Sequence, residues 1–286
     1  MRKHAGLWKL LTGETTKVDA VTAPTALYDP STTYESGEDP DLPAVTMTPY
    51  AARQYTKWLS AITGRDYRLP SEAEWEHAAR GGGGGPYGSG AGGAAVAADS
   101  LGRHAWTADN SDFAAQTAGG LAPNAWGLHD MLGNAAEWVL DGPRDSGPAP
   151  PAAGPVAWAD AVAWPTKAYP RIAKGGHWDA APADCRVASR TLSEDADWKA
   201  SDPNYPKSPW WYSDYPATAV GFRVVRPLRE MDEAMRRRVW EVDHPDIQAD
   251  VDARLEEGRG KQDRADQDLP AAIKALSSPG IDGLLN

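Results

Sequence analysis

Two adjacent glycines, Gly175 and Gly176, constrain the fold of this chain more than any other feature of its sequence. Paired glycines are typical of backbone that packs closely against other segments or adopts positive φ angles. The stretches on either side, 171–173 and 186–188, alternate polar and apolar residues and are predicted to be short strands. We therefore expect a polar site in the loop between them, residues 177–185.

The aromatic residues are unusual in kind, with 13 Trp and 10 Tyr but 2 Phe among 286 residues. Trp and Tyr combine a large apolar body with a polar tip, which suits half-buried positions in a loop-rich fold. Because the chain also contains 28 Gly and 24 Pro, little regular secondary structure is expected. The length fits one large domain, or one domain with an appendage.

Charge and cysteine content exclude several classes of function. A formal net charge of −11 argues against a nucleic-acid partner, because phosphate binding requires clustered Lys and Arg. The single cysteine, Cys185, excludes a disulfide within the chain and any site that needs two of its thiolates. No apolar run is long enough for a membrane span, and residues 1–8 lack the apolar region of a signal peptide. We expect a cytoplasmic protein.

A first helix is predicted after a strand at 43–48. Thr48 can cap it, Pro49 occupies its first position and Gly64 ends it. Apolar residues at helical spacing predict that one face of this helix is buried. The residues on that face are Ala52, Tyr55, Trp58, Leu59 and Ile62.

A second helix is predicted after the extended residues 67–70. Ser71 can cap its first turn, Glu74 can complete a capping box, and the helix continues to Arg80. The glycine-rich stretch 81–93 follows. It lacks the spacing and the lysine of a phosphate-binding loop, and it follows a helix instead of preceding one. We interpret it as a flexible connection.

The sequence changes character after residue 228. Residues 1–228 are predicted to form one domain, whereas 229–286 are predicted to be a charged, helical and partly disordered tail. Helices are expected at 230–239 and at 245–255 within this tail. Two roles for the tail remain open, since it could pack on the domain or bind a partner.

Four motifs stand in the same order as in the formylglycine-generating enzyme family, also called the sulfatase-modifying factor family. They are RLPSEAEWE at 68–76, NAWGLHDMLGNAAEW at 124–138, KGGHWD at 174–179 and GFR at 221–223. The resemblance runs from about residue 43 to residue 228. It implies a C-type-lectin-like α+β fold that is rich in loops. The opening strand of the family domain is not recognisable in residues 1–42, so either the chain starts inside the domain or its start is misassigned.

The resemblance implies a structural calcium site in the turn that ends the second motif. The implied ligands are the side chains of Asp130 and Glu137 and the carbonyls of Gly133 and Ala135. Carboxylates and backbone oxygens are the ligands that Ca²⁺ prefers. The alternative is a hydrogen-bonded turn without an ion. A second calcium site of the family uses a longer loop than the one found here, which leaves Asn110 and Asp112 as weaker candidates.

The catalytic residues of the family's oxidases are replaced in this chain. Those oxidases hold Cu(I), which prefers thiolates, between two cysteines that follow the double glycine. Residues 178–184 contain no thiol, and Cys185 stands where the oxidases carry a tyrosine. The family's serine is His177 here, and the tryptophan of its Trp-Glu-Trp pattern is Ala136. We therefore expect no copper, and we expect Cys185 to be a small buried residue.

Three functions remain open at this stage. The first is a non-oxidase member of the family that binds a protein, peptide or glycan as an accessory domain. The second is a formylglycine-generating oxidase that acts on a sulfatase through an unrecognised site. The third is a different chemistry at His177 and Asp179, with Cys185 as a further candidate. The residues predicted to line a ligand cleft are Trp178, Trp198, Trp210, Trp211 and Arg190. The stretch 198–214 resembles a variant found in bacterial members of the family.

Overall fold

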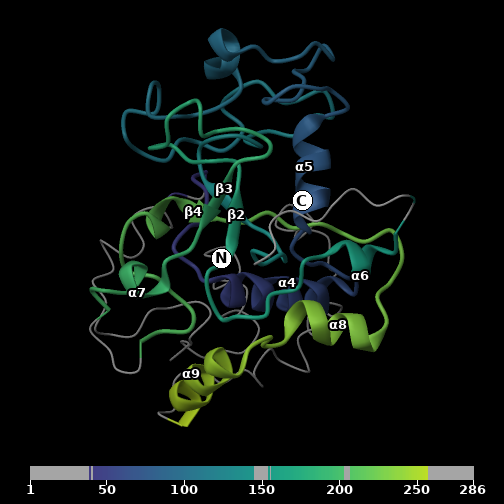
Figure 1. The fold of residues 1–286 in the computed structure, drawn as a ribbon, viewed down its shortest axis with the longest axis vertical. Helices are drawn as coiled ribbons and strands as arrows, with labels where there is room; N and C mark the ends of the chain where they lie inside the picture. The colour runs from purple at the N-terminus through teal and green to yellow at the C-terminus, as the bar shows by residue number, and fades with distance from the viewer. Residues whose placement is uncertain (1–38, 40, 145–153, 155, 203–206, 257–286) are drawn as a thin grey trace, which may run out of the picture.

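The computed structural model describes residues 39, 41–144, 154, 156–202 and 207–256, which form a mixed α+β fold with long loops (Figure 1). This confirms the predicted fold class. The α-helices are α4 (Pro49–Thr63), α5 (Glu72–Arg80), α6 (Trp158–Ala161), α7 (Asp195–Trp198), α8 (Glu233–Trp240) and α9 (Pro245–Glu256). Two short 3₁₀ helices are η1 (Ala98–Arg103) and η2 (Ala217–Ala219). The strands are β1 (Ala136–Trp138), β2 (Ile172–Lys174), β3 (Arg190–Leu192) and β4 (Val220–Gly221).

The sheet brings the sequence motifs together. Its strand order is β3-β2-β1-β4, with β1 antiparallel to β2 and parallel to β4. Glu137 on β1 therefore lies opposite Lys174 on one side and Gly221 on the other. The double glycine begins directly after β2, so its loop leaves the sheet next to the turn that precedes β1.

Helix α4 begins and ends where the sequence predicts. The Thr48 side chain accepts a hydrogen bond from the Ala51 amide, and Gly64 ends the helix with a left-handed φ of 64°. The predicted buried face is only partly correct, because Tyr55, Trp58 and Leu59 are half-buried. The buried side chains include four polar ones, Arg53, Gln54, Thr56 and Ser60.

The polar face of α4 is buried because the C-terminal helices cover it. In Figure 1, α4 lies between the sheet and α8. Arg53 donates hydrogen bonds to the carbonyls of Arg238 and Val239, at 2.7 and 2.8 Å, at the end of α8. Its guanidinium also pairs with Asp243 at 2.5 Å. A guanidinium at a helix C-terminus satisfies carbonyls that lack partners within the helix.

Asp243 is held from two sides, because Arg171 binds both of its carboxylate oxygens at 2.7 and 2.8 Å. Val239, Ile247 and Val251 also belong to the main hydrophobic core. The described part of the C-terminal segment, 229–256, thus packs on the domain. The rest of the predicted tail, 257–286, lies outside the described residues.

Helix α5 has the predicted capping box. The Ser71 side chain accepts from the Glu74 amide, and the Glu74 side chain accepts from the Ser71 amide. Glu74 also receives two hydrogen bonds of 2.7 Å from the Arg68 guanidinium, which fixes the chain before the helix. Trp75 on this helix is 1% exposed and contributes to the second hydrophobic core.

Two predicted strands are wrong. Residues 43–48, all within the described part of the chain, form no strand, and Met47 makes one isolated bridge with Trp211. Residues 186–188 form a turn, closed by a 3.0 Å hydrogen bond from the Ser189 amide to the Arg186 carbonyl. The third strand lies instead at Arg190–Leu192. Alternation over three residues cannot distinguish a strand from a turn that buries its central residue, as Val187 does here.

Candidate functional site

The double glycine is required by close backbone packing. Gly175 and Gly176 have φ angles of 97° and 72°, which side-chain-bearing residues rarely adopt. A Cβ atom on Gly175 would lie 2.9 Å from the Met131 carbonyl oxygen. A Cβ atom on Gly176 would lie 2.6 Å from the Cys185 sulfur. The loop after β2 therefore packs directly on the 130–137 turn and on the only thiol of the chain.

The Cys185 thiol is buried, and its pKa is raised. Its side chain is fully buried, and Sγ lies 3.8 Å from the His177 carbonyl oxygen, to which it can donate a weak hydrogen bond. Burial raises the pKa of the thiol to about 12. The thiolate is the form that binds metals and attacks substrates, so this cysteine is poorly suited to either task.

His177 and Asp179 lie together but do not bond side chain to side chain. His177 is 9% exposed, and its Nδ1 accepts a hydrogen bond from the Asp179 amide at 3.2 Å. This bond places the ring proton on Nε2. Burial lowers the pKa of His177, although the Asp179 carboxylate opposes the shift. The histidine is thus neutral near pH 7.

Tyr215 joins this pair from a distant part of the chain. Its hydroxyl donates to the Asp179 carboxylate at 2.7 Å. Burial together with this hydrogen bond raises the pKa of Tyr215 to about 12. The rings of His177, Trp178 and Tyr215 lie 6.2–6.3 Å apart between centroids, as a group of three. Tyr215 was not predicted as a site residue, because it follows Asp179 by 36 residues and has no motif around it.

The residues predicted to line a cleft are separated in the structure. Trp198, Trp210 and Trp211 are 2–4% exposed and belong to the main core. Trp178, by contrast, is half-buried beside His177. Arg190 lies on β3 and binds the Glu72 carboxylate at 2.5 and 2.6 Å. Among the five, the structure thus places Trp178 alone with His177 and Tyr215.

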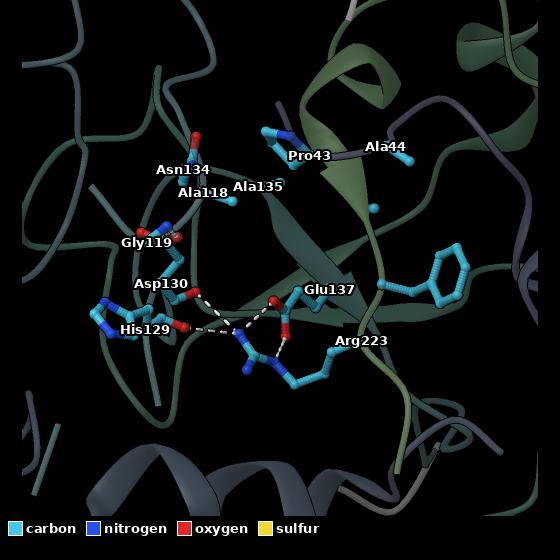
Figure 2. Close-up of a pocket in the computed structure, with 12 residues that line it drawn as sticks. Pro43, Ala44, Ala118, Gly119, His129, Asp130, Asn134, Ala135, Glu137 and Arg223 are labelled. Carbon is cyan, nitrogen blue, oxygen red and sulfur yellow. Dashed lines mark hydrogen bonds and ion pairs between the residues drawn. The ribbon is translucent and has the colours of Figure 1, made fainter. Parts of the chain in front are cut away.

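Glu137 lies on β1, at the C-terminal end of the turn predicted to bind calcium. Its Oε2 accepts from Trp75 Nε1 at 2.7 Å and from Arg223 Nε, while Oε1 accepts from Arg223 Nη2 at 2.7 Å. Figure 2 shows the guanidinium of Arg223 reaching between Glu137 and the backbone of residues 129 and 130. Sequence reasoning gave Arg223 no role, although the GFR motif marks its position.

The donor set of this turn fits a calcium ion in composition. Asp130 Oδ2 accepts from the Gly119 amide at 2.6 Å, whereas its Oδ1 is buried without a hydrogen-bond partner. A carboxylate has about four lone-pair sites, so the three bonds to Glu137 leave one on Oε1. A cavity of about 440 Å³ is lined by Asp130, Ala135 and Glu137. Calcium takes roughly six to eight oxygens, and this cavity leaves room for waters to supply the remainder.

In the second candidate calcium pair, the Asn110 side chain already makes hydrogen bonds within the local fold. Asn110 Oδ1 accepts from the Thr107 amide at 2.8 Å, and its Nδ2 donates to the Ala105 carbonyl at 3.1 Å. Asp112 is exposed nearby with a φ of 54°. Across the described residues, no group of three His, Cys, Asp or Glu side chains could hold a metal ion. The 130–137 turn would have to use backbone carbonyls as well.

None of the described helices combines the length and the apolar character needed to cross a membrane.

Comparisons with known proteins place this geometry in context. A family model described as "Sulfatase-modifying factor enzyme 1-like domain" matches residues 13–228, so the match starts earlier than the residue 43 expected from the motifs. The serine/threonine-protein kinase pkn1 of Chlamydia pneumoniae is 31% identical over 150 residues, which are 52% of this chain and 21% of the kinase. This chain therefore spans about a fifth of that relative's length.

Three solved structures are also similar. Treponema denticola variable protein 1 is 19% identical with a TM-score of 0.48, over 77% of this chain and 81% of that one. PvdO from Pseudomonas aeruginosa is 26% identical with a TM-score of 0.49, over 79% and 77%. CarF is 18% identical with a TM-score of 0.45, over 79% and 82%. Because the family model covers more than half of the residues, this chain belongs to the sulfatase-modifying factor, or formylglycine-generating enzyme, family.

Proposed function

We propose that this chain is a non-oxidase member of its family, which binds a protein, peptide or glycan ligand and acts as an accessory domain. The binding site proposed is the surface formed by Trp178, Tyr215 and the Asp179 carboxylate. The observation that carries the proposal is the state of Cys185, which is the only cysteine of the chain, fully buried and raised in pKa to about 12.

The chemistry of copper supports this proposal. Cu(I) is stabilised by soft thiolate ligands, and the resemblance to the oxidases implies a pair of them. One thiol with a pKa of about 12 supplies almost no thiolate near pH 7. Bringing Cys185 to the surface would also require the contact with Gly176 to open.

The aromatic side chains of the proposed binding site support a binding role. Trp178 and Tyr215 combine ring faces with polar tips, and Tyr215 is 52% exposed. Asp179 adds a carboxylate that accepts from Tyr215. The match to a protein named as a kinase, over 21% of that protein, is compatible with an accessory role for such a stretch within a larger activity.

The experiment that tests this proposal combines metal binding with turnover. The purified chain is titrated with Cu(I) against a competing chelator, and a Cys-x-Pro-x-Arg peptide is followed for O₂ consumption and aldehyde formation. We expect no stoichiometric copper and no aldehyde. Stoichiometric Cu(I) with aldehyde formation would establish the alternative, an oxidase that acts on a sulfatase cysteine.

We also propose that the 130–137 turn binds a structural Ca²⁺ ion through Asp130, Gly133, Ala135 and Glu137. The buried, unpartnered Oδ1 of half-buried Asp130 supports this proposal, because a buried carboxylate oxygen without a partner is costly. When bound, the ion would compensate the charge of Asp130, since Glu137 already pairs with Arg223, and would fix the turn. Calcium at one hundred times its Kd should stabilise the fold by about 2.7 kcal/mol.

Thermal unfolding after chelation, with and without added Ca²⁺, checks this site. The wild-type Tm should rise with calcium, and Asp130→Asn should abolish most of the rise. Asp160→Asn on α6, an exposed acid outside the turn, is the matched control and should keep it. An unchanged wild-type Tm over the whole calcium range would refute the site.

A further inference from the structure

Two aromatic side chains are strongly exposed on segments that meet near His177: Tyr215 packs beside the His177 ring, and the Phe113 backbone is linked to that of Trp178. Phe113 is 71% exposed and Tyr215 is 52% exposed, whereas most large apolar side chains of the described residues are buried. Contiguous exposed apolar groups are typical of interaction sites. We name the surface formed by Phe113, Trp178 and Tyr215 the aromatic surface. Phe113 is not part of the binding site proposed above, so the exposure of its large apolar side chain has no role in that proposal.

Hydrogen bonds show that Phe113 and Trp178 are neighbours. The Ser111 hydroxyl accepts from the Phe113 amide at 3.2 Å and donates to the Trp178 carbonyl at 2.8 Å. One hydroxyl therefore bridges the backbones of these two residues. A second link joins the same segments, since the Ala108 amide donates to the Ala180 carbonyl at 3.0 Å.

The loop that carries Phe113 is held in one conformation. Gln116 Nε2 donates to the Ser111 carbonyl at 2.7 Å, and the Gln116 backbone exchanges two hydrogen bonds of 3.0 Å with the Asn134 side chain. Phe113 itself has a φ of 58°. A backbone that is already held by hydrogen bonds loses less entropy when a partner binds, so this arrangement favours binding.

Charge decides which partner suits the aromatic surface. The two bridged segments, 105–116 and 176–185, contain four aspartates and neither Lys nor Arg, and Arg103 and Arg186 lie just outside them. The aspartates are Asp109, Asp112, Asp179 and Asp184. His177 adds no compensating charge near pH 7, because burial lowers its pKa. A cation is therefore attracted to this surface, and an anion is repelled.

We propose that the aromatic surface binds a basic protein segment in which Lys or Arg lies next to an apolar side chain. The cation would lie against the ring faces of Trp178 and Tyr215, where cation–π attraction adds to that of the carboxylates. The apolar neighbour would pack on Phe113. This inference rests on the proposed binding function and adds the charge of the partner and the role of Phe113. Binding of such a segment requires no cysteine in the partner.

Fluorescence anisotropy with short labelled peptides tests the inference. The first probe alternates Lys and Phe and contains no cysteine, the second replaces Lys by Glu, and the third replaces Phe by Gly. We expect the first probe to bind at least about tenfold more tightly than the second, with affinity that falls as NaCl rises. The third probe should be weaker than the first. Equal binding of the first two probes, or no binding of the first, would overturn the inference.

Matched variants separate this surface from the general acidity of the chain. Phe113→Ser should weaken the first probe by about tenfold, whereas Leu228→Ser, at a side chain that is 103% exposed elsewhere, should not. Asp112→Asn should weaken it by about two- to fivefold, and Asp160→Asn on α6 should leave it unchanged. If each variant behaves like its control, the probe binds by bulk charge and the inference fails.

The two proposals fail in different ways. Copper binding with aldehyde formation would remove the proposed non-oxidase function. Suppose that a neutral glycan or an acidic peptide binds, and that Trp178→Ala abolishes this binding. That result would support the binding function and would overturn the charge and the partner inferred here.

Discussion

The charged groups beside the sheet and those around His177 are arranged in opposite ways. Lys174 on β2 is completely buried and donates to Glu72 at 3.0 Å and to Glu76 at 2.9 Å, and Arg190 closes the network on Glu72. Around His177, Asp112 and Asp184 are exposed. The first region is a network of mutually dependent pairs around a fully buried cation, whereas the second is an acidic surface.

This difference predicts that the two regions tolerate substitution to different degrees. A buried ion pair is strongly destabilised when one partner is removed, since the other charge is left without compensation. Exposed groups are replaced at little cost. The motifs that identify the family, such as RLPSEAEWE and KGG, supply the buried network, and positions 177–184 lie outside it.

Lys174→Met should have the largest effect on stability and lower the free energy of unfolding by about 3–5 kcal/mol, because Glu72 and Glu76 would lose their buried cation. Urea unfolding followed by tryptophan fluorescence measures the change. Lys57→Met is the control, since the Lys57–Glu241 pair is about half exposed, at 42% and 44%. It should cost less than about 1 kcal/mol. Similar costs for the two variants would break the comparison.

Asp243→Asn should have the second-largest effect and lower the free energy of unfolding by about 3 kcal/mol. The reason is that Arg53 and Arg171 would both lose their carboxylate partner. Burial raises the pKa of Asp243, but the hydrogen bonds and charges of the two arginines outweigh burial and hold the pKa below its ordinary value. The stabilisation is therefore present above the unfolded pKa and is lost as pH falls through the folded pKa. Unfolding free energies measured from pH 7 downward should converge for the wild type and the variant. Parallel curves would contradict this origin.

Cys185→Ala should cost about 1 kcal/mol, as expected for the loss of a small buried group. Thiol labelling is the sharper measurement. With a pKa of about 12, only about 10⁻⁴ of the thiol is ionised near pH 8. A thiol reagent should react slowly with the native chain and rapidly once it is unfolded in urea. Fast labelling of the native chain would show that Cys185 is accessible and would weaken the argument against an oxidase.

Tyr215→Phe should have the smallest effect, below about 0.5 kcal/mol, because it removes one hydrogen bond from a half-exposed ring. The same urea experiment measures it. The variant keeps the ring face, so the basic peptide probe should still bind. A loss of stability close to that of Lys174→Met would show that the His177 region is part of the scaffold.

Local signals in the sequence predicted local structure well. The caps of α4 at Thr48 and Gly64 and the capping box of α5 were predicted correctly, because these motifs act within a few residues. The burial of Arg53 was not predictable in this way. Its partner Asp243 lies 190 residues further along the chain, and a polar residue on a helix ordinarily indicates a solvent-facing side.

In the candidate site, too, local motifs could be recognised from the sequence, whereas contacts between distant residues could not. Glu137 and the double glycine each belong to a recognisable motif, and the structure pairs Glu137 with Lys174, the residue before Gly175. The bond between Tyr215 and Asp179 depends on how the loop before η2 returns to the sheet, which no local pattern encodes. The turn at 186–188 was mistaken for a strand because three residues carry too little pattern to separate the two.

The docking of α8 on α4 has a consequence for synthesis of this protein on the ribosome. Arg53 leaves the exit tunnel 190 residues before the aspartate that neutralises it. At roughly 5–20 residues per second, about 10 to 40 s pass between the two events. During that interval the Arg53 guanidinium stays in water, so the docking of α8 on α4 is expected only after most of the chain has been synthesised.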